Sequence, residues 1–193
     1  MRVWRIPYST NCERVAIAAG IQAVPVVWVD VDAYDRTPVQ EVSGQGRVPV
    51  AELEGEIVVG SLAIVARIAP DLWPAEARAR AQVDVFLEWL DRVWMHPLGI
   101  LFTPGTDKER RARAGMRLDR SLDLFEGLLD GSDYLFGSLG VADVAAYPFL
   151  KYATDDNPDD VYEIHELMRR YQSVDGRPRL AAWLGRVAAL PQA

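Results

Sequence analysis

Short apolar runs alternate with a helical segment at the start of the chain. Val3–Ile6 is apolar, and Val24–Asp32 is β-branched with alternation near its end, so both predict strands. Between them, Asn11–Ala19 consists of small and apolar residues with helical spacing, and Gly20 is expected to stop this helix. The order strand, helix, strand predicts an α/β unit.

A polar segment that contains Gly44 and Gly46 precedes a second group of strands. The sequence RVPVAELEGEIVVGS predicts two strands joined by a hairpin turn at Glu54-Gly55. Ser61–Ala69 then predicts a helix, which ends because Pro70 cannot continue it.

Helical spacing dominates the rest of the chain. Ala75–Trp94 carries apolar residues at steps of three and four, and the sequence HPLGILFTPG is expected to interrupt this helix. Thr106 and Glu109 have the spacing of a capping box and predict the start of the next long helix, which ends near Gly131. Further helices are predicted at Val141–Tyr152, Tyr162–Tyr171 and Arg179–Leu190. The change of pattern at residues 69–74 predicts a domain boundary, with domains at residues 1–70 and 75–193.

Composition limits the partners of the protein. The chain has 193 residues and a net charge of −7, which disfavours nucleic acid as a partner. It contains no apolar stretch of roughly the 18 residues that a membrane helix needs, and MRVWRIPY is too short and polar for a signal peptide. One cysteine allows no internal disulfide, and the two histidines lack metal-ligand spacing. We therefore expect a cytoplasmic protein without a metal, a membrane partner or a nucleic-acid partner.

The segment YSTNCERV, residues 8–15, is the first candidate for chemistry. Ser9 stands three residues before Cys12 at a strand-to-helix turn, and this spacing places Ser9 just outside the helix and Cys12 one turn inside it. A simpler interpretation is that Ser9, Thr10 or Asn11 caps the helix that follows, because each of these side chains can accept from its free N–H groups. Cys12 is either a buried apolar filler or a thiol near the site. Tyr8 is the runner-up hydroxyl donor, and its alternative role is to pack beside Pro7. Arg14 is expected to be a surface or inter-domain charge, without a functional role.

Three motifs carry a resemblance to a known family. They are YSTNCERVAIAAG, then RVPV together with GSLAIVARIAP, and finally LDGSDYLFGSLGVADVAAYP. In order, they resemble the first loop and helix, the cis-proline and helix-start motifs, and the second-domain signature of the glutathione transferase superfamily. The similarity extends from about residue 2 to residue 190. It implies a thioredoxin-like N-terminal domain with the order βαβ-α-ββα and a mixed four-stranded sheet, followed by an all-α helical-bundle domain.

The resemblance also implies residue roles in the first domain. Ser9 matches the serine that donates a hydrogen bond to the glutathione thiolate, with Tyr8 and Cys12 as runners-up. The Val48-Pro49 bond would be cis, so that the backbone of Val48 pairs with the cysteinyl part of glutathione. Ser61, whose simpler role is a helix cap, would hold the γ-glutamyl carboxylate. Gln45 and Arg47 would reach the other end of the peptide.

One position departs from the family pattern. The residue before the carboxylate-binding serine is usually acidic or an amide and contacts the amino group of glutathione, whereas this chain has Gly60. The departure removes an anchor, so that a related thiol is an alternative to glutathione.

The second domain is expected to supply structure and a pocket wall. Gly140 would cap a helix whose N3 residue, Asp143, accepts from the cap backbone, and Asp143→Ala should cost roughly 1 kcal/mol. The walls of the pocket for a hydrophobic electrophile would come from Tyr8, Trp94, Met95, His96 and Phe102. Each of these is alternatively a core residue. His96 would cap carbonyls at a helix end, and His165 is expected in an exposed acidic helix.

Three functions fit this sequence. The first is a glutathione transferase-like enzyme that passes a glutathione thiolate to a hydrophobic electrophile, with glutathione as substrate and no cofactor. The second is a non-catalytic binding or regulatory protein of the same fold, which the glycine at position 60 favours. The third is a thiol-transfer enzyme that acts through Cys12. The resemblance further implies a homodimer.

Overall fold

The computed structural model describes residues 1–155, 157, 160 and 162–193. It divides into two units, Met1–Leu72 with Ala189–Ala193, and Trp73–Ala188. No helix in the described part of the chain is both long enough and apolar enough to span a membrane.

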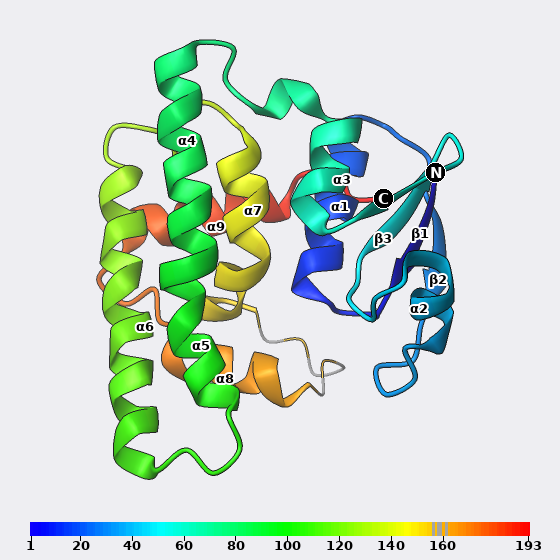
Figure 1. Cartoon of the computed structure of the whole chain (residues 1–193). Helices are drawn as coiled ribbons and strands as arrows, with labels where there is room; N and C mark the ends of the chain where they lie inside the picture. Colours follow the sequence, from blue (N-terminus) through cyan, green and yellow to red (C-terminus); the bar gives the residue numbers. More distant parts are fainter. Residues whose placement is uncertain (156, 158–159, 161) are drawn as a thin grey trace. The chain divides into compact units, whose positions relative to one another are not determined.

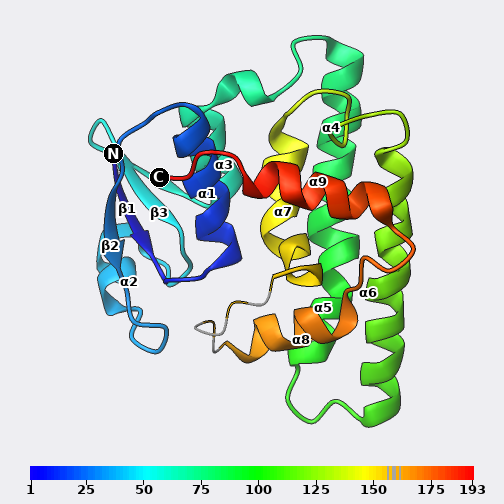
Figure 2. The same ribbon diagram turned by 180° about the vertical axis from the view of Figure 1, so that it is seen from behind.

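The first unit is built on a mixed four-stranded sheet of order β2-β1-β3-β4. Its strands are β1 (Arg2–Arg5), β2 (Val27–Asp30), β3 (Val50–Leu53) and β4 (Glu56–Val59), and its helices are α1 (Thr10–Ile21), α2 (Thr37–Ser43), α3 (Ser61–Ile68) and the short 3₁₀ helix η1 (Pro70–Leu72). β1 and β2 are parallel, whereas β1–β3 and β3–β4 are antiparallel. Figure 1 and Figure 2 show α1 and α3 on one face of the sheet and α2 on the other. This is the thioredoxin-like arrangement that the resemblance implied.

The turn between β3 and β4 follows from its two residues. Glu54 and Gly55 have φ values of 52° and 85°, the left-handed backbone that a two-residue hairpin requires at both positions. The register pairs Leu53 with Glu56 on either side of this turn. The sequence-based prediction of a hairpin at this position is confirmed.

Gly20 does not stop α1, and that prediction was wrong. The helix continues to Ile21, and a Cβ at Gly20 would lie 2.2 Å from the carbonyl oxygen of Pro191. The C-terminal residues lie against the helix at this point, since the Ala193 N–H donates to the Ala16 carbonyl at 3.0 Å. Glycine is therefore present for the close approach of the C-terminal residues, and not as a helix end.

In the described part of the second unit every regular element is a helix. Its elements are α4 (Ala77–Trp89), the π-helical turn η2 (Leu90–Trp94), α5 (Met95–Phe102), α6 (Lys108–Leu128), α7 (Val141–Leu150), the 3₁₀ helix η3 (Lys151–Ala153), α8 (Glu163–Tyr171) and α9 (Pro178–Ala188). In both views α4, η2 and α5 form one continuous rod beside α6. All ten residues of α7 are buried, so this helix is the centre of the core.

The expected interruption at HPLGILFTPG is confirmed only for its last three residues, 103–105, and is wrong for residues 96–102. The chain stays helical to Phe102, and the π-helical turn η2 lies directly before Pro97. A π turn widens the helix, and such bulges commonly mark helix irregularities. Proline has no N–H to donate to the carbonyl four residues earlier. The wider π-helical turn before Pro97 accommodates this loss, so that the helix continues from α4 into α5.

The start of α6 differs from the predicted capping box of Thr106 and Glu109. The cap is Asp107, whose carboxylate accepts from the Arg110 N–H at 2.8 Å. The Thr106 hydroxyl instead donates to the carbonyl of Thr103 at 2.8 Å. The side chain of Glu109 is paired with Arg113. The carboxylate of Asp107 therefore caps α6, in place of the predicted hydroxyl of Thr106.

The start of α7 is as predicted, and its aspartate does more than cap the helix. Gly140 is the cap residue, and its N–H donates to Asp143 Oδ2 at 3.0 Å. Asp143 Oδ1 also accepts from the Leu135 N–H at 3.0 Å and from Trp183 Nε1 at 2.8 Å. Burial is the main effect on the pKa of Asp143 and raises it, while these donors lower it. One carboxyl group thus joins α7, α9 and the preceding loop.

We predict that Asp143→Ala lowers the free energy of unfolding by about 3 kcal/mol, because three buried donors lose their acceptor. This exceeds the sequence-based value, which counted the cap alone. Urea unfolding measures the change. Asp130→Ala is the matched control, since this aspartate is exposed and should change the value by about 0.5 kcal/mol or less. A loss for Asp143→Ala no larger than the control would contradict the role of the carboxyl group.

Candidate functional site

The first turns of α1 and α3 are joined by a small buried polar cluster. Arg14 Nη1 donates to Asn11 Oδ1 at 2.9 Å and to Ser61 Oγ at 3.3 Å. Ser61 Oγ donates to Asn11 Oδ1, also at 3.3 Å. Arg14 is 5% exposed and Ser61 is 7% exposed. The expectation that Arg14 is a surface charge is wrong, because the side chain is buried in the first unit beside Ser61, the predicted carboxylate-binding serine.

Ser9 occupies the cap position of α1 without capping it through its side chain. Its backbone is extended, with φ −65° and ψ 118°, and no helix N–H donates to its hydroxyl. Its backbone is fixed on both sides, since the Ser9 N–H donates to Ile6 at 3.1 Å and its carbonyl accepts from Glu13 at 2.9 Å. Thr10 and Asn11 lie inside the helix, so none of the three predicted caps acts as one. The half-buried Ser9 hydroxyl is therefore not used by the helix backbone.

Tyr8 is held in an uncommon conformation beside Ser9. Its φ is 62°, in the left-handed region that non-glycine residues seldom adopt, and the residue is 46% exposed. Such outliers concentrate at functional sites. Tyr8 therefore stays a candidate hydroxyl donor, second to Ser9.

Cys12 is buried, as its alternative role of apolar filler requires. It is 4% exposed, and burial raises the pKa of its thiol above the ordinary value. The nearby Ser9 hydroxyl and Ile6 backbone lower the pKa, but to a smaller degree. At neutral pH the thiol is therefore protonated and a poor nucleophile.

The Val48-Pro49 peptide bond is cis, as the resemblance implied. Val48 is half-buried and precedes the β3 ladder, and its N–H and carbonyl form no backbone hydrogen bond within the described residues. The carbonyl of Pro49 accepts from the Gly60 N–H at 3.2 Å. This bond fixes the start of α3 beside the segment that carries Val48.

Gly60 has a conformational reason for its identity. Its φ is 96° and its ψ is 138°, a backbone that glycine adopts readily and other residues do not. Gly60, and not Ser61, is the cap residue of α3, so the helix-cap alternative for Ser61 is wrong. Ser61 is the first helical residue, and its hydroxyl belongs to the cluster with Asn11 and Arg14.

Gln45 and Arg47 differ in what their side chains do. Gln45 stabilises its own loop, because its Nε2 donates to Ser43 Oγ at 2.9 Å and its Oε1 accepts from the Arg47 N–H at 2.6 Å. Arg47 is exposed. The guanidinium of Arg47 is thus the more available of the two predicted anchors.

The predicted pocket walls from the second unit are of two kinds. Trp94 is 2% exposed and packs edge-on against Phe125 and Phe149, with ring centroids 6.0 and 6.3 Å away. Met95 and Phe102 are half-buried. His96 is exposed, and it does not lie at a helix end as predicted, because η2 continues directly into α5 at this point. Trp94 is therefore a core residue, which was the alternative to a pocket wall.

His165 was predicted to be exposed, and this is wrong. It is 3% exposed, stacks on Tyr152 with centroids 4.5 Å apart, and its Nδ1 lies 2.7 Å from both carboxyl oxygens of Asp160. Burial lowers the pKa of His165, and Asp160 opposes this. Among the residues that the structure describes, no three His, Cys, Asp or Glu side chains gather as a metal site.

Two family models match this chain. The model for the glutathione S-transferase N-terminal domain matches residues 4–70, and the model for the glutathione S-transferase C-terminal domain matches residues 108–186. The chain belongs to the glutathione transferase superfamily.

Individual members of the superfamily are distant from this chain in sequence. Human glutathione S-transferase theta-2 is 29% identical over 168 residues, which cover 77% of this chain and 63% of that protein. Glutathione S-transferase L1 of Arabidopsis thaliana is 25% identical over 150 residues, covering 75% of this chain and 58% of that protein. The chain therefore spans less than two thirds of the length of these relatives.

Solved structures of the superfamily share the fold. The Tau class enzyme of mango superposes with a TM-score of 0.79 at 19% identity, over 97% of this chain and 88% of that one. The bacterial enzyme BphK superposes with a TM-score of 0.77 at 21% identity, over 98% and 94%. Both likenesses concern the fold alone.

Sequence analysis missed two residues of this transferase-fold site, Asn11 and Arg14. Their spacing of three residues places them on one face of α1, which was a usable signal. A second signal is that Arg14 lies in a helix of mostly small apolar residues. A surface arginine is expected on the polar face of a helix, and this helix has little polar surface. What the sequence does not contain is the packing of α3, which supplies Ser61 as a partner.

We predict that Cys12 reacts slowly with iodoacetamide in the folded protein. Because its pKa is raised, the thiolate fraction at pH 8 is smaller than for a free cysteine, and burial further limits access. Mass spectrometry of native and urea-unfolded samples measures the two rates. Equal rates would show an accessible thiol and would revive the role of Cys12 in thiol transfer.

Proposed function

We propose that this chain is a serine-type glutathione transferase-like enzyme, in which Ser9 stabilises the thiolate of glutathione for attack on a hydrophobic electrophile. The observation that carries this proposal is the position of Ser9. Its hydroxyl stands at the N-terminus of α1, is not consumed as a cap, and belongs to the same unit as the cis Val48-Pro49 bond and the Arg14–Ser61 cluster. Family membership supports the reaction class, and the geometry supports the choice of residue.

The binding step uses backbone and charged groups. The N–H and carbonyl of Val48 would pair with the cysteinyl backbone of glutathione, as an added strand does. The Ser61 hydroxyl, the first N–H groups of α3 and the Arg14 guanidinium would hold the γ-glutamyl carboxylate, since helix N-termini and arginine both favour carboxylates. Arg14 would thus strengthen the hold on the carboxylate, whereas at Gly60 no side chain contacts the amino group.

The chemical step is a displacement or addition by sulfur. An ordinary thiol has a pKa of about 8.5, so little thiolate exists at neutral pH. A hydrogen bond from the Ser9 hydroxyl to sulfur favours the thiolate, and the thiol proton passes to solvent. The sulfur electron pair then forms the bond to carbon, and in a displacement the leaving group departs with its bonding pair.

Two other functions are weaker. A non-catalytic member of the same fold is favoured by Gly60, because a site that lacks the usual amino-group anchor would bind glutathione less tightly. The test is retention on immobilised glutathione together with turnover of a generic aryl halide, and the absence of both would favour this alternative. Thiol transfer through Cys12 is opposed by the burial and raised pKa of that thiol.

Assembly and location are further proposals. A homodimer is proposed from family membership, and sedimentation equilibrium measures it directly. A cytoplasmic location is proposed from the composition and the single cysteine.

We predict that Ser9→Ala lowers kcat/KM for glutathione conjugation by about 100-fold, because a donor to the developing anion is lost. Tyr8→Phe and Cys12→Ser should each change it much less. Steady-state kinetics with an aryl halide measures all three variants. A loss that follows Tyr8→Phe and not Ser9→Ala would transfer the role to tyrosine.

We predict that Arg14→Gln raises KM for glutathione by about tenfold with a smaller effect on kcat, because a charge-assisted contact to the carboxylate is removed. Ser61→Ala should act in the same direction. Arg67→Gln is the matched control, since this arginine is on α3 but half-exposed and paired with Glu56. Thermal unfolding checks that each variant folds. An unchanged KM in folded Arg14→Gln and Ser61→Ala would contradict the carboxylate site.

A further inference from the structure

The polar cluster at the starts of α1 and α3 offers donors to a ligand, while its amide acceptor is already in use. Asn11 Oδ1 accepts from Arg14 at 2.9 Å and from Ser61 Oγ at 3.3 Å, and an amide oxygen has two lone pairs. Asn11 Nδ2 makes no hydrogen bond within the described residues. The first N–H groups of α3 have no side-chain cap. The cluster therefore suits a carboxylate, which is an acceptor only.

An ammonium group differs from a carboxylate because it needs acceptors. The position that usually supplies one in the superfamily is Gly60, which has no side chain. Its φ of 96° disfavours every residue that has a side chain. A Cβ at Gly60 would meet no atom within 4 Å, so the backbone conformation, and not a lack of space, excludes the usual anchor.

The carboxylates of the described first unit do not replace this anchor. None of them accepts a hydrogen bond from Asn11 or Ser61. Glu13, two residues after Asn11, lies on a different face of α1. The others hold partners elsewhere or are exposed: Asp30 pairs with Arg5, Glu52 with Arg2 and Glu56 with Arg67, Asp71 accepts from Gln22, Asp32 and Asp35 accept from their own loop, and Glu41 and Glu54 are exposed.

We propose that this site recognises its thiol through the terminal carboxylate alone, and takes carboxyacyl peptide thiols that lack the α-amino group of glutathione. This inference rests on the proposed function and narrows its substrate class. The Arg14 guanidinium attracts the carboxylate and repels an ammonium on the neighbouring carbon. Moving that ammonium out of water is unfavourable when no acceptor replaces its hydration. N-glutaryl-cysteinylglycine, which is glutathione without its amino group, is the simplest member of this class.

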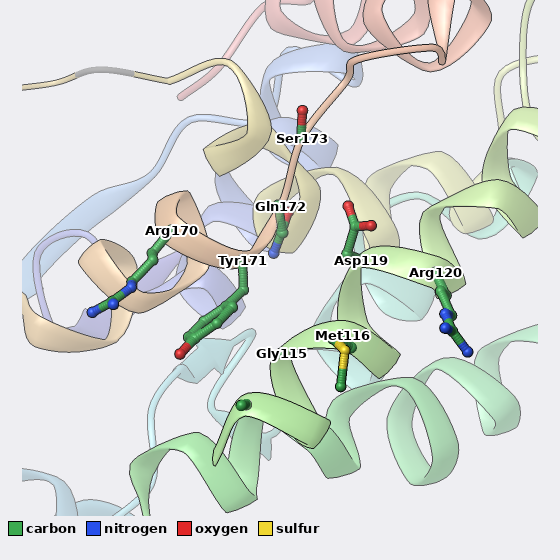
Figure 3. Close-up of a pocket in the computed structure, with 9 residues that line it drawn as sticks. Gly115, Met116, Asp119, Arg120, Arg170, Tyr171, Gln172 and Ser173 are labelled. Carbon is green, nitrogen blue, oxygen red and sulfur yellow. The ribbon is translucent and has the colours of Figure 1, made fainter. Parts of the chain in front are cut away.

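The helical unit contains another place where arginine side chains can meet a carboxylate. It is a cavity of about 410 Å³ whose walls include Asp119, Arg120 and Arg170. Figure 3 shows Asp119 and Arg120 extending from α6 and Arg170 from α8. The Asp119 carboxylate, held by Arg177 at 2.8 Å, is an acceptor for an ammonium. Binding in this cavity would therefore favour glutathione over its deaminated analogue, which is the opposite of the proposed preference.

The test compares three unreactive probes, which are the S-methyl derivatives of glutathione, N-glutaryl-cysteinylglycine and N-(4-aminobutanoyl)-cysteinylglycine. The second lacks the amino group, and the third lacks the carboxylate. Isothermal titration calorimetry gives each dissociation constant without turnover. We expect the glutaryl probe to bind as tightly as S-methylglutathione or up to about tenfold more tightly. The aminobutanoyl probe should bind at least about tenfold more weakly, because a charge-assisted contact is lost.

Asn11→Asp tests the cluster directly, since it replaces an amide by a carboxylate of the same shape. The new carboxylate attracts the ammonium of S-methylglutathione and repels the carboxylate that both probes share. The ratio of the two dissociation constants should therefore shift by at least about fivefold towards glutathione. Arg67→Gln is the matched control, because it changes the net charge equally at an exposed residue of α3, and should leave the ratio unchanged.

The outcomes separate this proposal from the proposed enzyme. A glutaryl probe that binds more than about threefold more weakly than S-methylglutathione would overturn the proposal and leave the enzyme intact. An unchanged ratio in Asn11→Asp, shown to be folded by thermal unfolding, would overturn it as well, and so would loss of glutaryl binding in Arg170→Gln. If none of the three probes binds, the glutathione-type site is refuted together with this proposal. The expected order of affinities without turnover of an aryl halide would refute the catalytic role of Ser9 alone.

Discussion

The hydrogen bonds among Asn11, Arg14 and Ser61 hold the first turns of α1 and α3 together, and the candidate glutathione site depends on them. A buried guanidinium is costly unless polar groups surround it, so these partners fix its position. The bond from the Gly60 N–H to the Pro49 carbonyl then ties α3 to the cis Val48-Pro49 segment. Ser9, at the start of α1, is thereby held in one framework with the groups proposed to bind the substrate.

The fold was predictable where the signal is local. Glu54-Gly55 favours a hairpin because glycine readily adopts the left-handed backbone of a two-residue turn. Asp143 three residues after Gly140 is a cap pattern that needs no distant partner. The Val48-Pro49 bond and the helical second half were accessible through resemblance and periodicity. Ser9 and Ser61 were predicted as site residues from the two strand-to-helix turns and the family resemblance, and the structure places each at the start of a helix.

Other features depend on partners that are distant in the sequence. From sequence alone, Gly20 looks like a helix end, but its role is to leave room for the backbone of Pro191. Pro97 resembles a helix break because a π-helical turn has no clear sequence signature. His165 looks exposed in an acidic segment, yet Tyr152 and Asp160 enclose it. Arg14 was missed for the same reason, since its burial is produced by the packing of α3. In each case, tertiary packing overrides the local pattern.

The central claim is that a hydroxyl at the start of α1 makes glutathione a better nucleophile. Titrating the ultraviolet absorbance of the thiolate, with glutathione bound to the wild type and to Ser9→Ala, measures this directly. For the wild type we expect a thiol pKa at least about one unit below the ordinary 8.5, and for Ser9→Ala a return towards that value. An identical pKa in the two complexes would contradict the claim.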